Sequence, residues 1–231
     1  MPLRAQRACT TVREDGAMAR LILVRHGQTR SNVQGLLDTA APGPGLTDLG
    51  REQAAALVEA LAAEPVDRIV ASPLARTVET ATPLASARGL PLQQDAGLRE
   101  VLAGDLEGLS DRESHLAYLG AVIAWAEGDL AAPIPGRLES GEGFLARYDR
   151  AVAAALDGVG TAVCVSHGAA IRAWAGSRAV NADGAFVAEH GLPNTGVVIL
   201  ERDGDRPWRV DAWLGRRMTD PEQDPTGAPL S

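Results

Sequence analysis

Lysine is absent from this sequence, so arginine supplies all 22 of its basic residues. Arginine presents a planar fork of N–H groups that matches phosphate and carboxylate bidentately, which lysine cannot do. The missing lysine also fits a bias in genome composition, and it therefore identifies no ligand by itself.

Positive charge is not in excess either, because the formal net charge is −8. A generic nucleic-acid-binding protein carries a clustered basic patch, whereas the arginines of this chain are scattered along it. We therefore expect no nucleic-acid partner. A negatively charged substrate would have to be met by a few arginines that converge in the fold.

Aromatic residues and cysteines are scarce. Aromatic residues make up 3% of the chain, so we expect a core built mainly of alanine, valine, leucine and isoleucine. Cys9 lies in a polar N-terminal stretch, and Cys164 lies in the apolar run TAVCVS, where it is interpreted as a small buried hydrophobe. Two such cysteines predict no disulfide framework, which is typical of a reducing, cytoplasmic compartment.

Long apolar runs are missing as well. No run approaches the length that spans a membrane, so we expect no membrane partner, and residues 1–19 lack the apolar segment of a secretory signal. A length of 231 residues suits one α/β domain. We expect that domain at residues 19–215, with a disordered N-terminal extension at 1–18 and a disordered tail at 216–231.

Short buried runs alternate with helical patterns along the chain. RLILVR (20–25), DRIVAS (67–72) and TAVCVS (161–166) are typical of strands buried on both faces. Helical patterns are predicted between and after them, at about 47–64, 73–89, 111–127, 141–156 and 169–176. This alternation predicts a three-layer α/β/α sandwich with a mainly parallel central sheet.

Three details of this pattern carry further expectations. Pro83 should kink or divide its helix, because proline lacks an N–H and its ring clashes with the preceding turn. Leu49 is assigned, with Leu57, to the apolar positions that recur at helical spacing. The segments TGVVILERD and RVDAWL alternate like strands near a sheet edge, and TGVVIL could pair across a homodimer.

Charged and polar side chains follow three of the predicted strands. Arg25 and His26 end the first strand, Arg76 follows DRIVAS, and His167 and Gly168 follow TAVCVS. In open α/β sheets, ligands collect outside the carboxyl ends of the strands. We therefore expect these side chains to meet at one edge of the sheet.

Two imidazoles and two arginines at one sheet edge suit the transfer of a phosphoryl group. Catalysis of this transfer is chiefly positioning and electrostatic stabilisation of the phosphoryl oxygens. A neutral imidazole can attack phosphorus and form a phosphohistidine, and a carboxylic acid must then protonate the leaving oxygen. The segment GLREVLAGDLEGLS offers Glu100, Asp105 and Glu107 for that task.

Four motifs give the chain a resemblance to a known family. LVRHGQTRSN, SPLARTVETA, LREVLAGDLEGL and VSHGAAIR occur in this order between Leu21 and about Leu200. Together they resemble the signature of the histidine phosphatase superfamily, which includes the cofactor-dependent phosphoglycerate mutases. The resemblance implies a phosphoglycerate mutase-like fold, and four motifs in order are far more specific than any one of them.

The resemblance also implies roles for individual residues. His26 is the nucleophile that becomes phosphorylated, and Glu100 is the proton donor, ahead of Asp105 and Glu107. The groups that contact the phosphoryl oxygens are Arg25, Asn32, Arg76, His167 and Gly168. Gly27 and Gly168 let the backbone approach the phosphate. No metal and no cofactor are expected, because the arginines neutralise the charge that a metal would otherwise balance.

The fate of the phosphoryl group separates two activities of this superfamily. A phosphoglycerate mutase should hold its substrate's carboxylate with extra basic groups, but residues 111–143 offer only Arg112 and Arg137. The loop 35–46 also departs from the mutase pattern, and Gly143 stands where the family often has serine. We therefore expect a metal-independent phosphomonoesterase acting on a small phosphorylated metabolite. The alternatives are a cofactor-dependent phosphoglycerate mutase and, from a different class, a non-catalytic phosphate-binding module.

Each candidate site residue, taken alone, also fits a purely structural role. A lone histidine is more often a satisfied structural residue, and Glu107 fits a surface or loop-fixing carboxylate. His115 and His190 belong to no motif, so we expect them to be structural or to line a rim. The joint occurrence of the four motifs favours catalytic roles for His26 and its partners.

Overall fold

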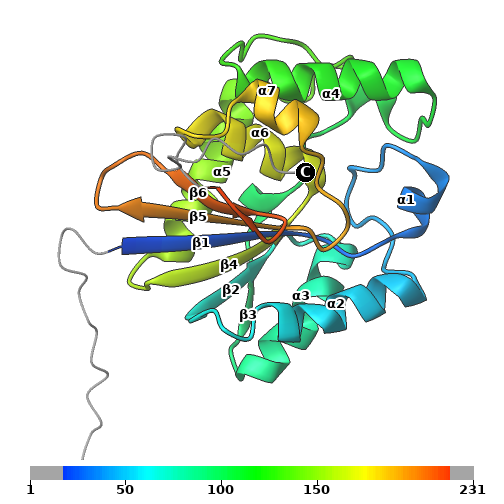
Figure 1. The fold of residues 1–231 in the computed structure, drawn as a ribbon. Coiled ribbons are helices and arrows are strands. Elements are labelled where there is room, and N and C mark those ends of the chain that lie inside the picture. The colour runs from blue at the N-terminus through cyan, green and yellow to red at the C-terminus, as the bar shows by residue number, and fades with distance from the viewer. Residues whose placement is uncertain (1–17, 219–231) are drawn as a thin grey trace, which may run out of the picture.

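The computed structural model describes residues 18–218 of the chain (Figure 1). The predicted N-terminal extension up to residue 17, Cys9 and residues 219–231 of the predicted tail lie outside the described residues. Within the described part, no helix is long and apolar enough to cross a membrane.

The described strands form one seven-stranded sheet in the order β3-β2-β4-β1-β5-β6-β7. Their bounds are β1 (Met18–Arg25), β2 (Arg68–Ala71), β3 (Leu92–Gln94), β4 (Thr161–Ser166), β5 (Val197–Asp203), β6 (Arg209–Trp213) and β7 (Arg216–Arg217). The pairs among β1, β2, β3 and β4 are parallel, and β5 to β7 add antiparallel pairs. The predicted, mainly parallel core of the sheet is therefore confirmed.

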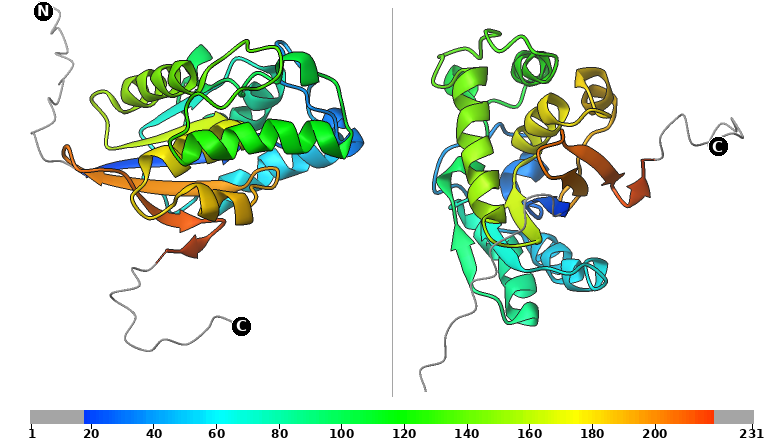
Figure 2. Two further views of the ribbon diagram at one scale, coloured as in Figure 1. Left: turned by 90° about the horizontal axis from the view of Figure 1, so that it is seen from above. Right: turned by 90° about the vertical axis from the view of Figure 1, so that its left-hand side faces the viewer.

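The helices are α1 (Arg30–Gln34), α2 (Asp48–Ala60), α3 (Ala75–Arg88), α4 (Arg112–Ala126), α5 (Gly141–Leu156), α6 (Gly168–Arg178) and α7 (Gly184–Glu189). Short 3₁₀ turns lie at Ala96–Leu98 and Gly104–Leu106. α2 and α3 cover one face of the sheet, and α4 to α7 cover the other (Figures 1 and 2). This arrangement confirms the three-layer α/β sandwich.

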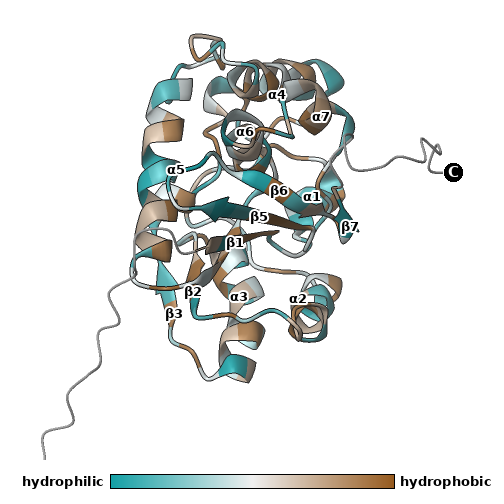
Figure 3. Ribbon diagram, turned by 60° about the vertical axis from the view of Figure 1, so that its left-hand side comes forward, coloured by the Kyte–Doolittle hydropathy of each residue, from teal (hydrophilic) through white to brown (hydrophobic). Residues whose placement is uncertain are grey.

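The side chains of β1 alternate between two cores, because successive strand residues point to opposite faces. Leu21 and Leu23 pack in a larger cluster with residues of α4, α5 and α6. Ile22 and Val24 pack in a smaller cluster with residues of α2 and α3. Figure 3 shows β1 as a hydrophobic strand between its covering helices. Burial on both faces fixes β1, and with it the residues at its carboxyl end.

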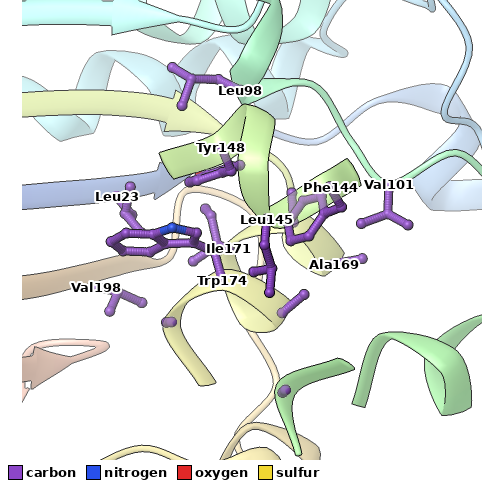
Figure 4. Packing of buried hydrophobic residues seen from close by; sticks show 14 of the residues in the cluster. Leu23, Leu98, Val101, Phe144, Leu145, Tyr148, Ala169, Ile171, Trp174 and Val198 are labelled. Carbon is purple, nitrogen blue, oxygen red and sulfur yellow. The ribbon is translucent and has the colours of Figure 1, made fainter. Parts of the chain in front are cut away.

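The few aromatic residues are gathered in the larger cluster. Trp125, Phe144, Tyr148 and Trp174 form a chain of neighbouring rings with centroid separations of 5.9, 5.6 and 5.6 Å. Figure 4 shows three of these rings in the packing around Leu23 of β1. The core is mostly aliphatic, as predicted, but aromatic rings join α4, α5 and α6 on this face.

Pro83 lies inside helix α3 and does not divide it, so of the two expected effects, a kink or a break, the break does not occur. The helix is continuous over Ala75–Arg88. The hydroxyl group of Thr82 donates a hydrogen bond of 2.7 Å to the carbonyl oxygen of Val78, which adds a contact beside the proline.

The edge of the sheet lies further along the chain than predicted. β5 pairs with β1 on one side and with β6 on the other, so the TGVVIL strand is not a free edge and the predicted route to a homodimer is wrong. Arg216 and Arg217, which were expected in a disordered tail, form β7 against β6. Leu49 is 48% exposed, because α2 turns Gly50 rather than Leu49 toward the body of the protein.

Two glycines bring α2 against the chain just after β1. A Cβ atom on Gly27 would lie 2.6 Å from the carbonyl oxygen of Gly50, and a Cβ atom on Gly50 would lie 2.2 Å from the carbonyl oxygen of Gln28. The close packing of α2 therefore requires glycine at position 27, which could not be predicted from the sequence.

We expect Gly50→Ala to lower the free energy of unfolding by about 1–3 kcal/mol, because the added methyl group meets backbone that cannot move aside cheaply. Chemical denaturation measures the change. Gly120→Ala is the matched control: its Cβ would meet nothing within 4 Å, so this helical position should gain about 0.5–1 kcal/mol. A Gly50→Ala variant as stable as the unmodified protein would contradict the contact.

Candidate active site

His26 follows β1 and is held through its backbone and its ring. Its N–H donates to the carbonyl oxygen of Ser166 in β4 at 3.0 Å, and its side chain is buried. Ring atom Nδ1 lies 2.8 Å from the carbonyl oxygen of Gly27. Because a carbonyl only accepts, we assign the proton to Nδ1, which leaves Nε2 with a free lone pair. Burial, and then the charges of Arg76 and Arg25, hold the pKa of His26 well below its usual value.

His167 follows β4 and lies beside His26, with ring centroids 5.3 Å apart in an edge-to-face arrangement. Its Nε2 lies 2.9 Å from the hydroxyl oxygen of Ser72, at the end of β2. Its Nδ1 is buried without a partner. Burial, reinforced by Arg76, holds the pKa of His167 well below its usual value. A neutral ring that accepts from Ser72 carries its proton on Nδ1, where it can donate to an anion.

Arg25 and Arg76 each leave a buried N–H group without a hydrogen-bond partner, Nε in Arg25 and Nη1 in Arg76. Their hydrogen bonds are to backbone carbonyl oxygens: Nη1 of Arg25 donates to Leu192 at 2.5 Å, and Nη2 of Arg76 donates to Asp38 at 3.0 Å. Burial lowers the pKa of both groups, and the negative charge of Glu100 partly offsets this. Unpaired buried donors on two cations are costly unless an anion occupies the site.

Glu100 brings a buried carboxyl group to this site. Its oxygens accept hydrogen bonds from the backbone N–H groups of Val101 at 2.9 Å, Ala169 at 3.2 Å and Ala170 at 2.8 Å, so it lies at the N-terminus of α6. These bonds favour the carboxylate, yet burial outweighs them and raises the pKa of Glu100. A raised pKa suits a proton donor near neutral pH.

The other two carboxylates of this segment have different positions. Glu107 accepts hydrogen bonds from the N–H groups of Thr39 at 2.8 Å and Ala40 at 3.1 Å, and also from the Thr39 hydroxyl group. It fixes the loop 35–46, as its structural interpretation predicts. Asp105 is exposed and does not line the cavity beside His26.

A cavity of about 450 Å³ opens beside the two histidines, within the size range of small-molecule sites. The predicted site residues that line it are Arg25, His26, Asn32, Arg76, Glu100 and Gly168. His167 lies behind them, in contact with His26, and His115 lies on the wall. Neither Arg112 nor Arg137 lines this cavity. In residues 18–218, no group of three or more His, Cys, Asp and Glu side chains is placed to hold a metal ion.

Asn194 is a site residue that the sequence analysis missed. Its amide nitrogen donates to the carbonyl oxygen of His26 at 3.1 Å and to Oδ1 of Asn32 at 3.0 Å. The N–H of Thr29 also donates to Oδ1 of Asn32, at 3.1 Å. Because Oδ1 is occupied twice, Asn32 has its amide N–H group left for a ligand in the cavity. No motif marks Asn194, which reaches the site from the loop before β5.

Arg172 also lines the cavity, although the sequence analysis gave it no role. It lies on α6 at the end of the motif VSHGAAIR, so this motif was the available signal. Its Nε and Nη2 donate to the carbonyl oxygen of Val187 at 2.8 and 2.5 Å, which fixes the guanidinium group at the cavity wall.

Arg147 of α5 fixes the backbone that carries Glu100. It donates to the carbonyl oxygens of Gly97 at 2.7 Å, Arg99 at 2.8 Å and Glu100 at 3.0 Å. Glu139 orients the guanidinium group through Nε at 2.5 Å and Nη2 at 2.9 Å. The acid therefore lies on a backbone segment that a partly buried ion pair holds in place.

Ser140 begins helix α5. It is the N-cap of this helix, and its hydroxyl oxygen accepts from the N–H of Gly143 at 3.1 Å. Glu139, which orients Arg147, therefore lies directly before the start of the helix that carries Arg147.

The paired histidines and the two arginines with unpaired N–H groups form a site that suits an anion such as a phosphoryl group. The family model of the histidine phosphatase superfamily (branch 1) matches residues 21–214. The chain belongs to this superfamily.

Two relatives of known sequence are similar to this chain over part of their length. The chain is 42% identical over 121 residues to glucosyl-3-phosphoglycerate phosphatase of Mycolicibacterium vanbaalenii, covering 51% of this chain and 52% of that one. It is 37% identical over 208 residues to the PE-PGRS family protein PE_PGRS11 of Mycobacterium tuberculosis, covering 83% of this chain and 36% of that one. The chain thus spans about half or less of the length of these relatives.

A solved structure extends over more of the chain. The mycobacterial glucosyl-3-phosphoglycerate phosphatase complexed with VO3 superposes with a TM-score of 0.70 at 31% identity, covering 86% of this chain and 100% of that one.

Proposed function

We propose that this protein is a metal-independent phosphomonoesterase that hydrolyses a small phosphorylated metabolite through a phosphohistidine intermediate. One observation carries the proposal: the free lone pair of His26 Nε2 lies at a cavity where Arg25 and Arg76 have unpaired buried N–H groups. A nucleophile beside two cations that each keep an unpaired N–H group suits an electrophilic phosphoryl group with negatively charged oxygens.

In the first step, Nε2 of His26 attacks phosphorus and the bond from phosphorus to the ester oxygen breaks. Glu100 gives its proton to the departing oxygen, while Arg25, Arg76 and the Nδ1–H of His167 stabilise the phosphoryl oxygens. In the second step, water attacks phosphorus, Glu100 takes a proton from that water, and the bond from phosphorus to His26 breaks. The products are an alcohol and inorganic phosphate.

Asn32 and Gly168 complete the proposed phosphate contacts. The amide N–H group of Asn32 is free for an oxygen of the ligand, as its doubly occupied Oδ1 indicates. A Cβ atom on Gly168 would lie 3.2 Å from Nε of Arg25, so glycine keeps space beside one of the unpaired donors.

Hydrolysis is better supported than isomerisation. The two basic residues considered as extra carboxylate ligands, Arg112 and Arg137, are exposed and lie outside the cavity. A non-catalytic module would not need both a nucleophile and an acid of raised pKa. The relatives named as phosphatases of a glucosylated phosphoglycerate support a small phosphate ester as the substrate class.

The unmodified protein should release phosphate from an aryl phosphate at the same rate with and without EDTA, because arginines supply the positive charge that a metal would otherwise provide. Phosphate release measured against time checks this. Incubation with 3-phosphoglycerate separates the alternatives: isomer without phosphate would indicate a mutase. A broad phosphomonoester panel that yields neither product would favour the non-catalytic module.

A single domain that includes all seven strands, residues 18–217, and a cytoplasmic location are kept as proposals. Cys164 is buried and free of disulfide bonds, which suits a reducing compartment.

A further inference from the structure

Asp38 lies in the loop 35–46, the segment that departs from the mutase pattern, and it lines the cavity. Two of its groups approach Arg76. Its carbonyl oxygen accepts from Nη2 at 3.0 Å, and its carboxylate Oδ1 lies 3.8 Å from Nη1. The second distance is too long for a hydrogen bond, so the carboxylate places a negative charge beside Arg76 without satisfying its N–H group.

The carboxylate of Asp38 is held in this position. Its Oδ2 accepts from the hydroxyl group of Ser31 at 2.5 Å, and Ser31 is buried. The loop is tied to α3 by the hydrogen bond of 3.0 Å from the N–H of Ala75 to the carbonyl oxygen of Pro42. Glu107 ties the same loop to the segment that carries the acid. The negative charge is therefore a fixed part of the cavity wall.

We propose that the carboxylate of Asp38 lowers the affinity of the phosphoryl site for phosphate, so that inorganic phosphate leaves after hydrolysis. The inference rests on the proposed function of this site. An anion drawn to Arg76 comes close to the carboxylate, and like charges repel strongly where water is largely excluded. The penalty applies to bound ester and bound product alike, so it raises KM and eases product release without slowing the chemical step.

A purely structural Asp38 would behave in the opposite way. If its only task were to position Arg76, its loss would loosen the guanidinium group and weaken phosphate binding. If it repels the ligand, removal of its charge strengthens phosphate binding. The direction of the change therefore separates the two roles.

Calorimetric titration of the whole chain with inorganic phosphate tests the proposal. Asp38→Asn and Asp38→Ala should each bind phosphate about tenfold more tightly than the unmodified protein, which corresponds to about 1.4 kcal/mol. Their KM for an aryl phosphate should fall in parallel. Asp38→Glu keeps the charge and should show no such gain. Asp105→Asn removes a carboxylate of an exposed residue outside the cavity and is the matched control.

Unchanged or weaker binding in both neutral variants, or no measurable binding in any of the proteins, would overturn the role of Asp38. If thermal melting shows that one neutral variant does not fold, the other decides the comparison. Hydrolysis of an aryl phosphate by the unmodified protein is measured separately, because it tests the proposed function and not the role of Asp38. Tighter binding without any hydrolysis would overturn the proposed function alone, and hydrolysis without tighter binding would overturn the inference alone.

Discussion

His26→Ala should abolish phosphate release from an aryl phosphate, with a loss on the order of 10⁴-fold or more, as expected when the nucleophile of a covalent mechanism is removed. His167, the imidazole in contact with His26, does not offer the same chemistry. When Ser72 donates to Nε2 of His167, the ring carries its proton on Nδ1, so neither ring nitrogen has a free lone pair for the attack. Steady-state kinetics with a chromogenic aryl phosphate measures the loss.

Rapid quenching tests the attack of His26 on phosphorus independently. The unmodified protein should carry an acid-labile, base-stable phosphoryl group on His26 shortly after mixing with substrate, and His26→Ala should carry none. His190→Ala is the matched control, because His190 is exposed and outside the cavity, and it should keep both the adduct and the activity. Full activity in His26→Ala would contradict the nucleophile, and a failure to trap any adduct would count against covalent catalysis.

The site residues that could be predicted from the sequence are those that follow parallel strands. His26, Arg76 and His167 follow β1, β2 and β4, which neighbour one another in the sheet. Because their strands run parallel, residues at their carboxyl ends share one edge whatever the loops do. The motifs therefore indicated both the chemistry and its location.

The remaining site residues come from loops, whose paths depend on tertiary contacts. Asn194 reaches His26 because the chain before β5 turns back over the strand end. Asp38 reaches Arg76 because Glu107 and Ser31 hold its loop. Neither Asn194 nor Asp38 lies in a local sequence pattern that indicates such a contact, so composition and periodicity could not predict their positions.

The same distinction applies to the fold. Apolar runs located the strands, because burial on both faces leaves a clear pattern. The position of β5 inside the sheet depends on β6 pairing beyond it, and alternation looks the same in a strand with one partner or two. Glycine is ordinarily unfavourable inside a helix, yet Gly50 lets α2 lie directly against the backbone of Gln28.

Glu100→Gln should lose about 10²- to 10⁴-fold in kcat/KM with alkyl phosphates, whose poor leaving groups need a proton in the transition state. With an aryl phosphate that has a good leaving group the loss should be much smaller. Glutamine keeps the size of the side chain and an oxygen that can accept the N–H groups of Val101 and Ala170. The fold should therefore persist, and the difference between leaving groups should report the missing acid.

The pH dependence follows from the directions of the two pKa shifts. Burial raises the pKa of Glu100, so its carboxyl group stays protonated to higher pH. Turnover of alkyl phosphates therefore declines as the pH rises through that pKa. The lowered pKa of His26 keeps its lone pair available on the acid side, so activity is lost only as the pH falls through that pKa. In Glu100→Gln the alkaline decline should disappear, while Asp105→Asn should keep the complete profile. Equal losses for aryl and alkyl phosphates, with the alkaline decline retained, would assign proton donation to another carboxyl group.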